Sequence, residues 1–157
     1  MTPNWLYFWL LFVVVPLTIA TGVSAMMRTA LTIFIAWMVN TLVVEASDTF
    51  DFWLFFIFSD AVAAWFVLYQ PAGKVQSVIG GLLLSQIAVH GVYGISKFIS
   101  PETLNPFRYM DVIDTLGLLQ LLLLGGWAGG HWSRVAYRAL RHRSHWRPRS
   151  QSPRSMA

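Results

Sequence analysis

Two ionisable side chains that could carry a proton lie inside long apolar stretches of the sequence. Asp60 lies eight residues into the stretch 52–69, close to its middle, and His90 lies in the stretch 75–96. An ionised side chain near the middle of a bilayer costs at least ~2.5 kcal/mol, so such residues are candidates for proton, ion or substrate contact. The alternative is structural: Asp60 holds helices together as a protonated or hydrogen-bonded acid.

The turn between these two stretches decides which polar residues lie at one depth. Counted from Ala72, Asp60 is 12 residues away, Gln86 is 14 and His90 is 18. At a rise of 1.5 Å per residue, Asp60 and Gln86 lie within about 3 Å of one level, and His90 lies roughly 9 Å nearer the outer face. We therefore expect Gln86 to be the direct partner of Asp60, with His90 one to two turns above. Two further polar candidates on other apolar stretches are Asn40 and Gln120.

The sequence lacks the usual patterns of catalysis and cofactor binding. It contains no cysteine, no phosphate-binding Gly-Lys loop, no G-x-S-x-G elbow and no H-E-x-x-H pair. His90 and His131 are separated by about 20 Å in depth, so they cannot ligate one haem iron. The acidic residues form no complete oxygen cage for a divalent cation. We expect a protein that is not an enzyme and has no catalytic residues, cofactor or metal site.

The elements that must position these side chains are apolar helices. Hydrophobic residues make up 56% of the 157 residues and charged residues only 11%, whereas a soluble domain carries about 25% charged residues. A helix needs roughly 20 residues to cross a ~30 Å hydrocarbon core. Five apolar stretches follow one another, and we expect each to be a transmembrane helix: 5–25, 29–45, 52–69, 75–96 and 112–132.

Short linkers between the stretches predict an up-down bundle over residues 1–132. The stretch 29–45 is near the lower length limit for a span, and if it is re-entrant, four spans remain. Residues Val23-Ser24-Ala25 resemble a signal-peptide cleavage site, but the first four residues carry no positive side chain. We therefore expect the first stretch to be retained.

The distribution of positive charge predicts the orientation. Residues 133–157 hold seven arginines and no acid, while residues 1–132 hold four basic and seven acidic side chains. With the C-terminus in the cytoplasm, Arg28 and Lys74 also lie inside, and only Lys97 and Arg108 lie outside. The positive-inside rule therefore predicts an external N-terminus. Compactness and the lack of eukaryotic sorting signals favour a bacterial or phage-encoded protein of the inner membrane.

The C-terminal tail, residues 133–157, is a candidate docking segment for anionic lipids or cytoplasmic partners. Its first three arginines recur at helical spacing, which indicates that the last helix extends with one basic face. From residue 142 onward the composition predicts disorder. No folded nucleic-acid-binding module accompanies the tail, so we do not expect nucleic acid as a partner. The docking candidates are Arg134, Arg138, Arg141, Arg143, Arg147 and Arg149.

Glycine pairs in the last apolar stretch predict close helix packing. Gly125 and Gly129, and likewise Gly126 and Gly130, are spaced four residues apart. Small residues at this spacing let two helix backbones approach closely. The neighbouring helix could belong to the same chain, to a second copy, or to another subunit of a membrane complex.

Three functions are compatible with these features. The first is a permeabilising or assembly-forming protein; in architecture alone, with no shared residue motif, the chain resembles phage holins. The second is a small transporter or a membrane subunit of a larger complex, with Asp60, Gln86 and His90 as a polar relay. The third is a membrane anchor that displays its basic tail to cytoplasmic partners.

Overall fold

The structure, a computed structural model, describes residues 5–47, 52–69, 71, 73–100 and 106–145. These residues form five α-helices and no strand, which confirms the predicted all-α class. The helices are α1 (Trp5–Ile19), α2 (Ser24–Ser47), α3 (Trp53–Leu68), α4 (Lys74–Ile99) and α5 (Pro106–His145).

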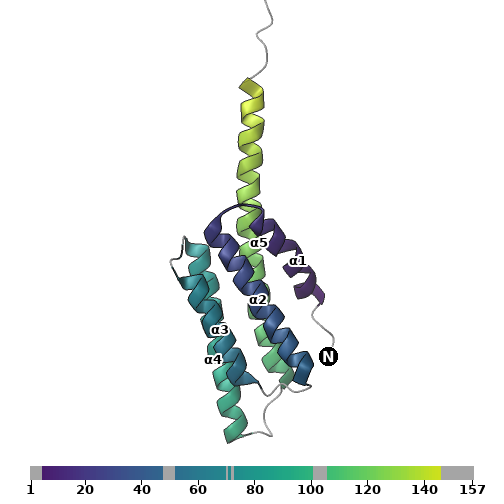
Figure 1. The fold of residues 1–157 in the computed structure, drawn as a ribbon, viewed down its shortest axis with the longest axis vertical. Coiled ribbons are helices and arrows are strands. Elements are labelled where there is room, and N and C mark those ends of the chain that lie inside the picture. Colours follow the sequence, from purple (N-terminus) through teal and green to yellow (C-terminus); the bar gives the residue numbers. More distant parts are fainter. Residues whose placement is uncertain (1–4, 48–51, 70, 72, 101–105, 146–157) are drawn as a thin grey trace, which may run out of the picture.

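The helices run alternately up and down, and α5 projects beyond the others (Figure 1). Each helix packs against the next one in the sequence, and α5 also packs against α1, so the five helices follow one another in a closed cycle. The ends of α1 and α3 and the starts of α2 and α4 meet at one end of the bundle, which we call the basic end because it holds Arg28 and Lys74. Arg28 Nη2 donates a hydrogen bond there to the Tyr69 carbonyl oxygen, at 2.6 Å.

Three helices are long and apolar enough to cross a membrane, namely α2 over Ser24–Ala46, α4 over Lys74–Ile99 and α5 over Arg108–Arg141. The other two apolar helices are shorter, with 15 residues in α1 and 16 in α3. At 1.5 Å per residue they measure about 22–24 Å, less than a ~30 Å hydrocarbon core. The shortest predicted stretch, 29–45, therefore lies in α2, which is long enough to cross a membrane. The two short helices are its neighbours α1 and α3.

Local sequence explains where α2 and α5 begin. Gly22 has a φ of 70°, a left-handed conformation that glycine adopts without steric cost, and it ends α1 early enough for α2 to start at Ser24. The expected helix 29–45 therefore lacks the first turn of α2. Pro106 lies between the expected helices 75–96 and 112–132, but it is the first residue of α5, a position where its fixed φ and missing N–H are tolerated.

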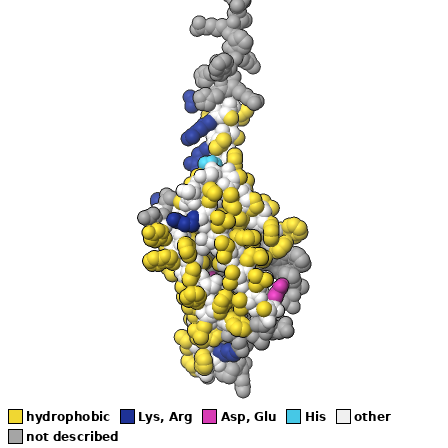
Figure 2. Space-filling view, in the orientation of Figure 1, with side chains coloured by type: hydrophobic (Ala, Val, Ile, Leu, Met, Phe, Trp, Pro, Cys, Tyr) yellow, Lys and Arg dark blue, Asp and Glu magenta, His cyan; other side chains and the backbone are white. Residues whose placement is uncertain are grey.

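The core of the bundle is apolar, and so is its surface. A buried cluster combines side chains from all five helices, including Leu11, Ala30, Val67, Leu83 and Leu124. On the surface, Phe58, Trp65 and Phe98 are 68%, 68% and 81% exposed. Figure 2 shows hydrophobic side chains over the bundle. Lys and Arg side chains gather on the projecting part of α5 and near the basic end, and another positive side chain lies at the opposite end. A continuous apolar surface of this kind needs a bilayer or a partner to cover it.

The predicted tail begins as a helix. The last helix continues through Arg134, Arg138 and Arg141, which are exposed, and ends at His145. The predicted extension of the helix is confirmed. The disorder predicted from residue 142 onward is wrong for residues 142–145, which are helical, and residues 146–157 lie outside the described residues. The backbone at Arg143 is helical, whereas Arg147 and Arg149 lie outside the described residues.

Candidate functional site

One face of α4 brings polar side chains into the bundle. Gln76, Gln86, His90 and Tyr93 are all buried, and they alternate with the buried apolar residues Ile79 and Leu83 at the spacing of one helix face. The polar residues therefore lie at successive levels along the bundle axis. Each of them except Tyr93 makes a hydrogen bond to a neighbouring helix.

Asp60 of α3 bonds His90 of α4. The distance from Asp60 Oδ2 to His90 Nε2 is 3.1 Å, and the two residues are 4% and 3% exposed. Asp60 faces inward because it shares one face of α3 with Phe56, Ala63, Ala64 and Val67. A buried carboxyl group is stable only when its oxygens have partners, and His90 supplies one.

The second ring nitrogen of His90 contacts α5. His90 Nδ1 and the Tyr109 hydroxyl group form a buried hydrogen bond, so Asp60, His90 and Tyr109 form one chain across three helices. We call these three residues the Asp–His–Tyr chain. When Asp60 is ionised, the neutral imidazole donates from Nε2 to Asp60 and accepts the Tyr109 proton at Nδ1.

Aromatic rings hold the imidazole in place. Phe56 lies beside the His90 ring with centroids 5.4 Å apart. Tyr93 stacks on Tyr109 with centroids 4.0 Å apart and an angle of 17° between the rings. Because Phe56 packs against His90 and Tyr93 stacks on Tyr109, both hydrogen-bonding rings are restricted in their orientation.

A separate pair of amides lies one turn from His90. Gln120 Nε2 of α5 donates to Gln86 Oε1 at 2.8 Å, and Gln86 Nε2 approaches the Ile113 carbonyl oxygen at 3.5 Å. The predicted polar residues Gln86 and Gln120 thus contact each other. The predicted direct bond between Asp60 and Gln86 is wrong, because His90 is the partner of Asp60.

The register of α3 against α4 explains this error. Leu68 lies against Gly80, and Trp53 lies against Gly94. The pairs Leu68–Gly80 and Asp60–His90 have midpoints at residues 74 and 75, not at Ala72. The first turns of α4 extend past the end of α3, and this shift brings His90 to the level of Asp60.

Two other polar candidates do not join this chain. Asn40 of α2 is partly exposed, and within the described part of the protein its buried Oδ1 has no hydrogen-bond partner. His131 stacks on Trp127 with centroids 5.6 Å apart, far along α5 from Tyr109. Among the described residues, no three His, Cys, Asp or Glu side chains are grouped as metal ligands would be.

Sequence reasoning missed two members of the polar interior. Tyr109 lay in a presumed linker, although Pro106 three residues earlier is a recognised helix start. Gln76 was not singled out; its Nε2 donates to Thr29 Oγ1 at 2.8 Å and to the Ala25 carbonyl oxygen at 2.9 Å, near the basic end. Ten residues separate Gln76 from Gln86, which corresponds to about 15 Å along α4.

The four glycines of α5 differ in their surroundings. A Cβ atom at Gly125 would lie 3.1 Å from Val14 of α1, so this glycine lies at a contact within the chain. A Cβ atom at Gly126, Gly129 or Gly130 would meet nothing within 4 Å. Their predicted contact with a second copy or another subunit stays a prediction.

The fold and the site define an all-α protein with three helices suited to cross a membrane and a buried Asp–His–Tyr chain. Comparison with the models of known protein families, with curated proteins and with solved structures finds no match to this chain.

Proposed function

We propose that this chain is a small, non-enzymatic, multi-pass membrane protein that transfers protons through Asp60, His90 and Tyr109. The observation that carries the proposal is the buried contact of a carboxyl, an imidazole and a phenol from α3, α4 and α5. Carboxyl and imidazole groups are the side chains that proton relays in membrane proteins use, and the phenol extends their hydrogen-bonded chain to a third helix. If these three residues only held the helices together, uncharged hydrogen-bonding residues could replace them at the same positions.

The Asp–His–Tyr chain can gain one proton without losing a hydrogen bond. With Asp60 ionised, His90 donates from Nε2 and accepts at Nδ1. With Asp60 protonated, Asp60 donates to Nε2, and Nδ1–H donates to the Tyr109 oxygen. Both arrangements use the two observed contacts, so each nitrogen and oxygen atom in them keeps a partner. In the second state the Tyr109 hydroxyl hydrogen points away from His90.

An apolar layer separates the Asp–His–Tyr chain from the basic end. Ile79, Leu83, Leu121 and Leu124 are at most 3% exposed and lie between the Gln86–Gln120 pair and Gln76. Protons that reach His90 from the opposite end therefore need a rearrangement of the helices before they can leave at the basic end. We propose that the protein transports protons without a partner subunit, and that transport is coupled to such a rearrangement. It would not conduct protons through a permanently open pore.

The proposed topology has five crossings in a bacterial inner membrane, with an external N-terminus and a cytoplasmic C-terminus. The apolar surface, the alternating helix directions and the positive charges at the basic end support it. The two short helices would cross where the bilayer thins around them. The exposed arginines of α5 would then lie against anionic lipid headgroups on the cytoplasmic side.

Inducible expression in bacteria tests the proposed function. Wild-type protein should lower the membrane potential steadily, and Asp60→Asn should restore it at equal abundance in the membrane. Asp111→Asn is the matched control, because Asp111 is an exposed acid at the start of α5. A normal potential and normal growth with the wild-type chain would exclude proton transfer by this protein alone.

A second candidate function is permeabilisation by assemblies of several copies, as in holins. The open surroundings of Gly126, Gly129 and Gly130 support it, because an outward glycine face permits close helix contact between copies. In the same experiment, an abrupt loss of potential that is unaffected by Asp60→Asn but is abolished by Gly126→Leu would favour this function over proton transfer.

A further inference from the structure

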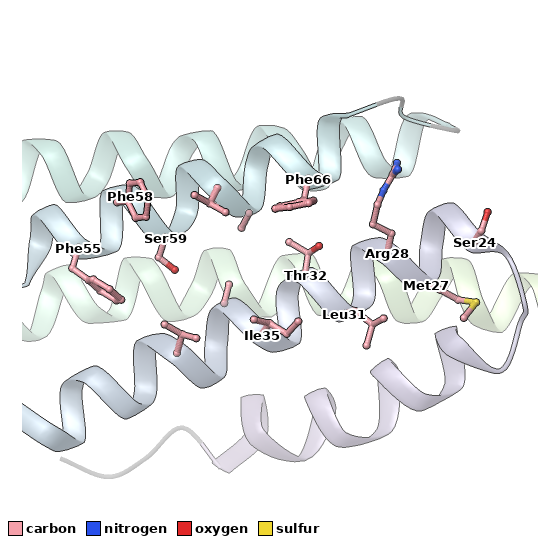
Figure 3. Close-up of a pocket in the computed structure, with 14 residues that line it drawn as sticks. Ser24, Met27, Arg28, Leu31, Thr32, Ile35, Phe55, Phe58, Ser59 and Phe66 are labelled. Carbon is pink, nitrogen blue, oxygen red and sulfur yellow. The ribbon is translucent and has the colours of Figure 1, made fainter.

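A groove of about 640 Å³ lies between α2 and α3. Its walls are mainly apolar: Leu31 and Ile35 line it from α2, and Phe55, Phe58 and Phe66 line it from α3 (Figure 3). Ile35, Phe58 and Phe66 are at least half exposed, so the groove opens on the outer surface of the bundle. On a membrane-spanning bundle that surface faces lipid.

The groove carries a positive charge at one end only. Arg28 lines it next to the turn between α1 and α2, and Ser24 lies beyond Arg28 at the same end (Figure 3). The Arg28 guanidinium group is fixed by its hydrogen bond to the Tyr69 carbonyl oxygen, at 2.6 Å. Lys74, which is exposed at the start of α4, adds a second positive charge to the basic end.

The dimensions match an acyl chain that starts at a membrane surface. Lining residues on α2 extend from Ser24 to Val39, which corresponds to about 22 Å along the helix axis. Half of a ~30 Å hydrocarbon core is about 15 Å. The acyl chain of a lipid whose headgroup lies at Arg28 therefore reaches the middle of the bilayer within the groove.

We propose that this groove binds one anionic phospholipid, with an acyl chain between α2 and α3 and the phosphate group at Arg28. Apolar walls select the hydrocarbon chain, and the guanidinium group recognises phosphate by paired N–H donors. A bilayer supplies this ligand at high local concentration on the surface onto which the groove opens. The groove thus has a charged end and an apolar length, as an amphiphile has. A uniformly apolar partner helix would leave the charged end without a partner of opposite charge.

Native mass spectrometry of the detergent-solubilised full chain tests the proposal. We expect one phosphatidylglycerol molecule to bind in preference to phosphatidylcholine of the same acyl composition. Arg28→Gln should weaken phosphatidylglycerol binding about fivefold, comparable to the effect of one basic residue near an anionic surface. Arg28→Lys should retain only part of the binding, because it keeps the positive charge but loses the paired N–H donors. Arg138→Gln, which removes an exposed charge on α5, should leave the binding unchanged.

A second pair of variants tests the acyl site. Thr32 points into the groove (Figure 3), so Thr32→Phe should displace the chain, whereas Val92→Phe at a 65% exposed position of α4 should not. Circular dichroism confirms that each variant is folded. Equal binding of the two lipids, full binding by Thr32→Phe, or equal loss in Arg28→Gln and Arg138→Gln would each overturn the proposal. Displacement by oleate at equal concentration would overturn the phospholipid as the occupant and point to a free fatty acid.

Discussion

Asp60 Oδ2 lies 3.1 Å from His90 Nε2 in the interior of a bundle whose outer surface is apolar. The other nitrogen of the same imidazole contacts Tyr109. Both ring nitrogens of His90 are therefore engaged, one by a helix that precedes it in the sequence and one by a helix that follows. A single imidazole therefore joins α3, α4 and α5.

Asp60→Ala, which removes the carboxyl group, should destabilise the protein more than Asp60→Asn, which replaces it with a neutral amide. Asp60→Ala leaves His90 Nε2 buried without its partner, which costs about 1–3 kcal/mol. Asp60→Asn retains a side-chain oxygen that can accept from Nε2, so the loss should be under about 1 kcal/mol. Unfolding in detergent micelles measures both, with Asp111→Ala as the exposed control. Equal stabilities of Asp60→Ala and Asp60→Asn would show that the contact with His90 contributes nothing.

The Tyr109 hydroxyl group should contribute to the stability of the protein independently of the Tyr109 ring. Tyr109→Phe retains the stacking on Tyr93 but removes the partner of His90 Nδ1, and we expect a loss of about 0.5–1.5 kcal/mol. The nitrogen-15 chemical shifts of His90 should change at the same time. Tyr137→Phe is the control, because Tyr137 is 67% exposed on the same helix. Unchanged His90 shifts in Tyr109→Phe would contradict the observed hydrogen bond.

Two glycines on α4 should respond in opposite ways to the same substitution. A Cβ atom at Gly94 would lie 2.4 Å from the Trp53 ring, whereas one at Gly91 would meet nothing within 4 Å. Gly94→Ala should therefore cost about 1–3 kcal/mol through overpacking. Gly91→Ala should be neutral or slightly stabilising, because alanine favours helix by up to ~1 kcal/mol over glycine. Thermal unfolding of the two variants side by side tests the α3–α4 contact, which a reversed order of stability would contradict.

The exposed basic face of α5 should bind anionic membranes. Replacement of Arg134, Arg138 and Arg141 by glutamine removes about 1 kcal/mol of attraction per residue, so a peptide of residues 133–157 should lose at least tenfold in affinity for phosphatidylglycerol vesicles. Binding of the unmodified peptide should weaken with added salt, since exposed charges are screened. Equal, salt-independent binding of both peptides would assign the attraction to apolar contacts.

Helix class and approximate positions follow from the sequence, because long apolar stretches broken by short polar turns have few alternatives to an up-down helical bundle. The pairing of side chains does not follow, because a shift of about three residues in the midpoint of the α3–α4 pairing, from residue 72 to residue 75, moves the partner of Asp60 along α4 by about six residues. That shift depends on how Gly80 accommodates Leu68 and how Gly94 accommodates Trp53. The spacing of apolar residues contains no information about it.

The candidate site was predictable in part. Asp60, Gln86, His90 and Gln120 stand out because polar side chains are costly inside apolar stretches, and all four are buried. Tyr109 does not stand out, because a tyrosine near a helix start is ordinary at a membrane interface. Its role depends on α5 beginning at Pro106 and on the packing of α5 against α4, which only the folded chain determines.

Proton flux into liposomes tests the central claim most directly. The purified full chain would be reconstituted with a pH-sensitive dye inside the vesicles, and a potassium diffusion potential would drive protons inward. We predict acidification of the interior by the wild-type protein, its loss in Asp60→Asn at equal incorporation, and its retention in Asp111→Asn. Absence of flux with the wild-type protein at both polarities, or equal flux with Asp60→Asn, would contradict proton transfer through Asp60 and His90.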